Sequence, residues 1–323
     1  MSKTRATQPV SRVHAAETHP CTTRRELSER EEATMQVWSY ASQVNDVDAV
    51  NSHWFETDGG TVLIDAQRIL PEAERALEHL RATTSAPVVA IVVTHAHTDH
   101  YGGLPVWRDA FPDAALYVHP MTYDVIMGDT RGFADARRRR HGRDFPAFQR
   151  IVTAMEGAIA VEEGSEITVG SARLRFVPMG ASEAEQTTMV DVMGENVTFI
   201  GDLVNVGAPA VPFDSLANWL DQLDRIEAEF TDRALYQGHG RAPLQEGDLA
   251  DQRRFLLRLR DLTRDAAADD RIVPDARDAA VFALEREWPF YQGVAGNTRR
   301  QILAFAIERV AKQMDIAIEG AGE

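Results

Sequence analysis

The stretch THAHTDH, at residues 94–100, constrains the fold of this chain more than any other segment. It follows APVVAIVV, an uninterrupted apolar run rich in β-branched residues, which is typical of a strand buried on both faces. Residues 71–84 before it show helical spacing, and residues 115–118 after it form a further strand-like run. The order predicts β-α-β units whose buried strand leaves the core at a histidine cluster.

The histidine cluster has the composition of a metal site. Side chains alternate along an extended backbone, so His95 and His97 point the same way and can chelate one ion. Asp99 and His100 come off the following turn, towards a second position at the separation that two-metal hydrolases use. A lone histidine would be more simply explained as a surface or hydrogen-bonded residue. Three histidines and an aspartate in one turn favour metal binding.

Composition and charge exclude several classes of partner. With 323 residues, 44% of them hydrophobic, the chain can bury a sizeable core. The formal charge of -16 argues against a nucleic-acid partner, which would need an extended basic face. Cys21 is the single cysteine, which excludes an internal disulfide and a cysteine-built metal cage.

No run of residues resembles the apolar core of a signal peptide or a membrane span, so we expect a cytoplasmic protein with no membrane partner. Residues 1–30 are polar and without periodicity, and we expect a disordered or loosely docked tail there. Residues 31–243 carry the alternating pattern and form the predicted main domain. Residues 244–323 read as helices that pack on this domain or form a homo-oligomer contact, because the stripe of Ile302, Leu303, Ala306, Ile307, Val310 and Met314 requires burial.

Two later residues are candidate ligands on their own chemistry. Asp202 follows the apolar run VTFI, where a lone carboxylate needs a partner to offset its desolvation, although it could instead cap a turn. His239 stands between two glycines, which permit a close approach, although it could be a plain loop residue.

The motif THAHTDHYGG resembles the metal-binding motif of the metallo-β-lactamase superfamily. The resemblance extends from Asn51 to Gly240 through TDGGTVLIDA, AFPDAALYVHP, FIGDLV and QGHG, in the family's order. It implies an α+β fold: a four-layer αβ/βα sandwich of two facing sheets with helices outside, here with additional C-terminal helices. It also assigns residues 31–243 to this type of domain.

The resemblance implies a ligand set. His95 and His97 would bind the first metal, Asp99 and His100 the second; Asp202 would bridge the two, and His239 would complete the second. One ligand departs from the pattern, because Ala181 stands where many members carry a histidine.

Glu183 and Glu185 are the nearby residues that could replace the missing ligand, since a carboxylate oxygen is an acceptable zinc donor. The stretch ASEAEQ is similar to a glutamate-bearing turn of the alkylsulfatase branch, and its spacing favours Glu183. That branch normally has a glutamate at the bridging position, where this chain has Asp202. Otherwise both glutamates are surface residues of a loop.

Residues 137–143 belong to an arginine-rich insertion in this otherwise acidic chain. Guanidinium groups grip sulfate, phosphate or carboxylate through paired donors, so the segment could select an anionic small-molecule substrate. A solvated helix or an oligomer contact explains it equally well.

The predicted function is metal-dependent hydrolysis. Zn²⁺, with two ions per chain, would generate a metal-activated hydroxide that attacks a small ester, lactone, amide or sulfate ester, and the ligated Asp99 would orient this nucleophile and help to move its proton. Iron is compatible with the same donors, so a mononuclear iron oxygenase on the same fold is one alternative. A non-catalytic metal-binding protein is another.

Overall fold

The computed structural model describes residues 35–42, 49–129, 132–288 and 296–319. The fold below is that of the compact unit Thr34–Glu323. The tail expected for residues 1–30 lies outside the described residues, and the division of the chain at residue 243 stays a prediction.

The first sheet has the strand order β1-β2-β3-β4-β5-β6. Its strands are β1 (Val37–Ala41), β2 (Asn51–Thr57), β3 (Gly60–Ile64), β4 (Val88–Val93), β5 (Ala115–Val118) and β6 (Ile159–Ala160). β2 and β3 form an antiparallel hairpin across Asp58 and Gly59, as the glycine-rich turn predicts. From β3 to β6 the pairs are parallel, so β4 is an inner strand, which its unbroken apolar sequence requires.

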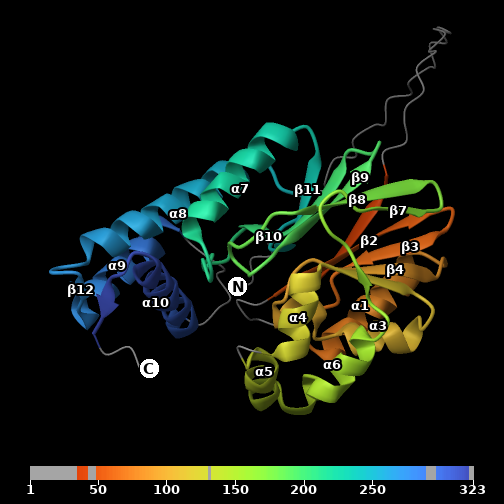
Figure 1. The fold of residues 1–323 in the computed structure, drawn as a ribbon, viewed down its shortest axis with the longest axis horizontal. Helices are drawn as coiled ribbons and strands as arrows, with labels where there is room; N and C mark the ends of the chain where they lie inside the picture. Colours follow the sequence, from red (N-terminus) through yellow and green to blue (C-terminus); the bar gives the residue numbers. More distant parts are fainter. Residues whose placement is uncertain (1–34, 43–48, 130–131, 289–295, 320–323) are drawn as a thin grey trace, which may run out of the picture. The chain divides into compact units, whose positions relative to one another are not determined.

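Helices cover the outer face of the first sheet (Figure 1). They are α1 (Leu70–Thr83), α2 (Thr98–Tyr101), α3 (Leu104–Ala110), α4 (Pro120–Gly128), α5 (Phe133–His141) and α6 (Phe148–Met155), with the 3₁₀ turn η1 (Gly142–Asp144) before α6. Leu80 of α1, Trp107 of α3 and Ile151 of α6 are buried in one cluster with Ile91 of β4. The arginine-rich segment is therefore helical over most of its length.

The second sheet has the strand order β11-β10-β9-β8-β7. Its strands are β7 (Glu166–Val169), β8 (Ala172–Pro178), β9 (Thr188–Met193), β10 (Val197–Asn205) and β11 (Ala234–His239). The sheets face each other across an apolar cluster that includes Val92, Phe176 and Val190. The rings of Phe55 and Phe199 stack in this layer with their centroids 5.8 Å apart.

Outside the second sheet lie α7 (Leu216–Glu229), α8 (Asp248–Asp265), α9 (Pro274–Glu287) and α10 (Gly296–Gln313), with the small pair β12 (Arg271–Ile272) and β13 (Ala317–Ile318) (Figure 1). Leu303 and Ile307 of α10 are buried with Leu256 of α8 and Leu284 of α9. This cluster buries most of the apolar stripe of α10. The predicted four-layer αβ/βα sandwich with additional C-terminal helices is confirmed. In the described part of the chain, no helix combines the length and apolar character needed to cross a membrane.

The two sheets approach each other at one edge. Val50, directly before β2, forms an isolated antiparallel bridge with His239 at the end of β11. The neighbouring strand β10 pairs with β11 in parallel, with Asn205 opposite His239. The loop after β4 and the ends of β10 and β11 therefore lie together, and they carry the predicted ligands.

Candidate metal centre

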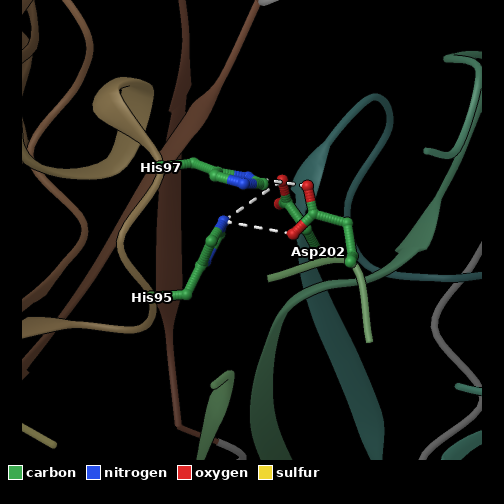
Figure 2. Close-up of side chains that lie close together, drawn as sticks. His95, His97 and Asp202 are labelled. Atoms are coloured by element: carbon green, nitrogen blue, oxygen red, sulfur yellow. Dashed lines mark ion pairs between the residues drawn. The ribbon is translucent and has the colours of Figure 1, made fainter. Parts of the chain in front are cut away.

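The histidine cluster lies in the loop between β4 and α2. His95 is fully buried and His97 is 9% exposed. Figure 2 shows both imidazoles, from the same loop, directed towards the carboxylate of Asp202. The alternation that predicted a shared direction for these two side chains therefore continues into the loop beyond the strand.

A first group of potential ligands contains His95, His97, Glu183 and Asp202. His97 Nδ1 lies 2.7 Å from Glu183 Oε1. His95 Nε2 lies 3.5 Å from Glu183 Oε2 and 3.6 Å from Asp202 Oδ2. Glu185, in contrast, belongs to neither of the ligand groups found among the described residues.

A second group contains Asp99, His100, Asp202 and His239. Asp202 Oδ2 lies 2.9 Å from His239 Nε2 and 3.3 Å from His100 Nε2. Asp99 Oδ2 lies 3.2 Å from His239 Nε2. Asp202 thus belongs to both groups, which is the arrangement of a residue that bridges adjacent cations.

Several of the potential ligand atoms lack the hydrogen bonds that buried polar atoms normally make. Among the described side chains, His95 Nε2, His100 Nε2, Glu183 Oε2 and Asp202 Oδ1 are buried without a hydrogen bond. Buried polar atoms left in this state are rare, because each loses its hydration without compensation. Nitrogen and oxygen donors at this spacing fit divalent metal ions, which would compensate the loss.

Neighbouring groups fix the histidine rings. His100 Nδ1 donates to Asp65 Oδ2 at 2.7 Å. The Thr94 hydroxyl donates its proton to Asp65, so it accepts a hydrogen bond from His95 Nδ1 at 3.0 Å. His239 Nδ1 donates to the carbonyl of Ala49 at 2.9 Å. Each ring is left with Nε2 facing the centre, as in metal sites whose ligands are oriented by an outer layer of hydrogen bonds.

The turn that carries Glu183 is held by α7. Gln222 donates to the carbonyl of Met179 at 2.6 Å, and Asn218 donates to the carbonyl of Ala181 at 2.8 Å. The backbone N–H of Asp214 donates to the carbonyl of Ser182, directly before Glu183. The glutamate is therefore a buried side chain on a fixed turn, and not a surface residue of a loose loop.

Three further residues border the centre. Arg68 is buried, and its Nη2 lies 3.0 Å from Asp99 Oδ2. Gly238 lies so close to Asp202 and His100 that a Cβ atom at this position would overlap both side chains. From the arginine-rich segment, Arg137 reaches the centre and donates from Nε to Thr98 Oγ1 at 3.2 Å.

Burial and mutual charge shift the pKa values at the centre. Burial raises the pKa of Glu183 well above its ordinary value and lowers the pKa of His97 to about 4. Burial lowers the pKa of His239, but the nearby Asp202 carboxylate has the larger opposite effect and holds this pKa well above its ordinary value. Burial likewise raises the pKa of Asp99, but Arg68 and neighbouring histidines hold it well below its usual range.

The structure brings together all the predicted ligands except the alternative Glu185. Sequence reasoning missed the residues around them. Asp65, Arg68 and Gln222 are the most informative omissions. Asp65 stands at the end of a buried strand in LIDA, the same position that drew attention to Asp202, so a signal for it was present. Arg68 and Gln222 have no comparable signal, because their partners lie far away in sequence.

Comparison with known proteins agrees with the fold. The model of the metallo-beta-lactamase superfamily matches residues 45–266, more than half of the chain. The chain belongs to this superfamily.

Curated relatives match parts of this superfamily chain. It is 23% identical over 192 residues to a beta-lactamase-like protein 2 homolog of Caenorhabditis elegans, a stretch covering 59% of this chain and 55% of that protein. It is 39% identical over 62 residues to an (R)-specific secondary-alkylsulfatase of a Pseudomonas species, covering 19% of this chain and 9% of the relative. The chain therefore matches about half of the first relative's length and a small part of the second.

Solved structures share the superfamily fold. A metallo-beta-lactamase family protein from Thermus thermophilus has a TM-score of 0.59 at 19% identity, covering 86% of this chain and 93% of its own. A beta-lactamase domain protein from Burkholderia ambifaria has a TM-score of 0.58 at 20% identity, covering 86% of this chain and 84% of its own. At these identities the likeness concerns the fold alone.

Proposed function

We propose that this chain is a dinuclear metal-dependent hydrolase of a small ester, lactone, amide or sulfate ester. One observation carries the proposal: the ligand groups share Asp202, and several of their buried ligand atoms have no hydrogen bond. The proposed ligands are those named above, with Glu183 in the place of the family's usual histidine.

The charge of the centre supports bound cations. Among the described residues, Asp65, Asp99, Glu183 and Asp202 are buried carboxylates, whereas Arg68 is the buried guanidinium facing them. Buried carboxylates at this density are costly unless cations neutralise them. Divalent metals, for which we propose zinc, would supply that charge. Without them, protons on Glu183, His100 and His239, whose pKa values are all raised, take their place.

The residues of the chain would divide the hydrolytic work. When bound, metal ions of this kind lower the pKa of water and polarise the bond to be broken. Arg68 holds Asp99 in place, and Asp99 would orient the attacking water and take its proton. Asp65 keeps the His100 ring in the tautomer that presents Nε2.

Sulfate esters belong in the proposal for a specific reason. Glu183 belongs to the first group of potential ligands, and the chain matches a 62-residue stretch of an (R)-specific secondary-alkylsulfatase. Asp202 at the bridging position separates the chain from the usual pattern of that branch. A cytoplasmic location and a homo-oligomeric state stay predictions.

Elemental mass spectrometry of the purified protein tests the ligand set. We expect about two zinc ions per chain for the parent, and about one for Glu183→Ala. Glu185→Ala is the matched control, since it removes a carboxylate from the same turn, and it should keep both ions. One iron per chain would instead favour an oxygenase, and no bound metal after zinc loading would contradict the proposal. Hydrolysis of sulfate esters, lactones or β-lactams must be lost on chelation and return with zinc.

A further inference from the structure

The cavity above the metal centre has one apolar side. It has a volume of about 290 Å³, and candidate ligands including His97 lie on its floor. Side chains from three separate segments line the same cavity: Phe133 of α5, Phe213 of the connection between β10 and α7, and Phe305 of α10. We call these three phenylalanines the aromatic wall.

Ring contacts make the aromatic wall continuous with the centre. The Phe213 ring centroid lies 4.9 Å from that of His97 and 6.1 Å from that of Phe133. On its other side, Phe213 lies 5.4 Å from Phe305. An apolar surface therefore runs from a proposed metal ligand outward to the C-terminal helices.

Helix α10 holds this surface in place. Arg309 donates to the carbonyl of Phe213, and its guanidinium lies 5.9 Å from the centre of the same ring. Gln313 donates to the carbonyl of Pro212 at 2.8 Å and accepts from the N–H of Leu216 at 2.8 Å. These hydrogen bonds hold the backbone on both sides of Phe213, so its position is fixed before any ligand binds.

The aromatic wall retains surface that a ligand could cover. Phe305 is 39% exposed, and Phe133 and Phe213 are half-buried. The arginines that line the same cavity already contact the protein, because Arg68 pairs with Asp99 and Arg137 donates to Thr98. The free energy available for binding on this side thus comes from covering apolar surface.

We propose that the aromatic wall binds an apolar alkyl, acyl or aryl group of the substrate while the scissile group lies at the metal centre. The substrate is then an amphiphilic ester, and α10 is a specificity element of the active site. This inference rests on the proposed function and adds the substrate class to it.

Hydrolysis of 4-nitrophenyl esters from acetate to octanoate by the zinc-loaded protein tests the inference. For the parent, kcat/KM should rise about two- to fourfold per added methylene, the range expected for partial to full burial. In Phe305→Ala and Phe133→Ala, which alter separate helices, the ratio of octanoate to acetate kcat/KM should fall about tenfold, mainly through KM. Phe282→Ala is the matched control, because Phe282 is an exposed phenylalanine of α9 that contacts Arg300. It should leave the ratio unchanged.

Calorimetric binding of 1-octanol and 1-butanol provides a readout that needs no hydrolysis. Octanol should bind more tightly than butanol, and Phe305→Ala should weaken octanol binding about tenfold. Alcohol binding that depends on chain length, without turnover of any ester, would contradict the proposed function but support the role of the aromatic wall. Ester turnover with no dependence on chain length, together with unchanged octanol binding in the variants, would contradict the proposed role of the aromatic wall. A parent dimer that dissociates in Phe305→Ala, with an unchanged length profile, would overturn it too and assign the surface to a second copy of the chain.

Discussion

Histidine side chains in this protein have different roles because their ring nitrogens have different partners. His53 is buried, and both of its nitrogens are engaged: Nε2 donates to the carbonyl of Gln237 at 2.9 Å, and Nδ1 accepts from the Ser39 hydroxyl at 2.7 Å. His100 has one nitrogen held by Asp65 while the other makes no hydrogen bond in the described structure. The first pattern is structural, and the second is that of a ligand.

The buried His53 gives the protein a pH-dependent stability. Burial lowers the pKa of His53 to about 4, against an ordinary value of 6.5, so between these values the unfolded chain binds a proton that the folded chain does not. The free energy of unfolding therefore falls as the pH falls through this window. His53 should contribute a loss of about 2 kcal/mol between pH 7 and pH 5.

Urea unfolding of the parent and of His53→Gln at both pH values measures this contribution. Glutamine can both donate and accept at this position but does not titrate, so the variant should lose about 2 kcal/mol less than the parent between the two pH values. An equal pH-dependent loss in the two proteins would mean that His53 can take up a proton in the folded state without cost.

At the scale of elements, α7 positions a proposed metal ligand that it does not itself carry. Its buried Gln222 donates to the carbonyl groups of Met179 and Ala181, on the turn that leads to Glu183. The turn joins β8 to β9 and has irregular backbone, so its shape depends on such bonds. A helix on the outer face of the second sheet thereby positions a ligand at the sheet edge.

Gln222→Ala should weaken the first metal site selectively. Loss of the two hydrogen bonds frees the turn, and the zinc affinity of the site containing Glu183 should fall roughly 10- to 100-fold, the usual effect of removing an outer support of a ligand. Competition with a chelating indicator measures the affinity of each zinc. Gln301→Ala, an exposed glutamine of α10, is the control. Equal weakening of both sites would indicate a general loss of stability instead.

At the scale of the whole molecule, the proposed centre joins the two halves of the sandwich. The loop after β4 belongs to the first sheet, whereas β10 and β11 belong to the second. Metal bound between His95, His100 and Asp202 would therefore cross-link the sheets and neutralise buried carboxylates. The stability of the folded chain should depend on metal occupancy.

Chelation should lower the thermal midpoint of the parent by on the order of 10 °C, because ions that bind the folded state alone stabilise it by mass action. Added zinc should restore the midpoint, as followed by differential scanning fluorimetry. Asp202→Ala lacks the bridging carboxylate, so its midpoint should respond little to the chelator. An unchanged midpoint in the parent would contradict a metal that links the sheets.

Local patterns were sufficient for much of the fold. The apolar run of β4 and the apolar stripe of α10 each depend on residues close in sequence, so the chain itself predicts them. The types of the potential ligands were equally visible, because four of them, His95, His97, Asp99 and His100, lie within one short segment. Family resemblance then supplied Asp202, His239 and the four-layer arrangement.

Tertiary structure decided what local pattern could not. Glu183 and Glu185 have the same chemistry, and the sequence favoured Glu183 only through the spacing of a resemblance. Packing of the turn against α7 buries Glu183 beside His97 and leaves Glu185 outside the ligand groups. Arg68 reaches Asp99, and Phe305 reaches the cavity, across large separations in sequence. The sequence by itself determined which chemistry the chain can carry, because ligand types and strand patterns are local. The folded molecule determined which carboxylate lies beside the histidines and which side chains line the cavity, because those depend on contacts between distant elements.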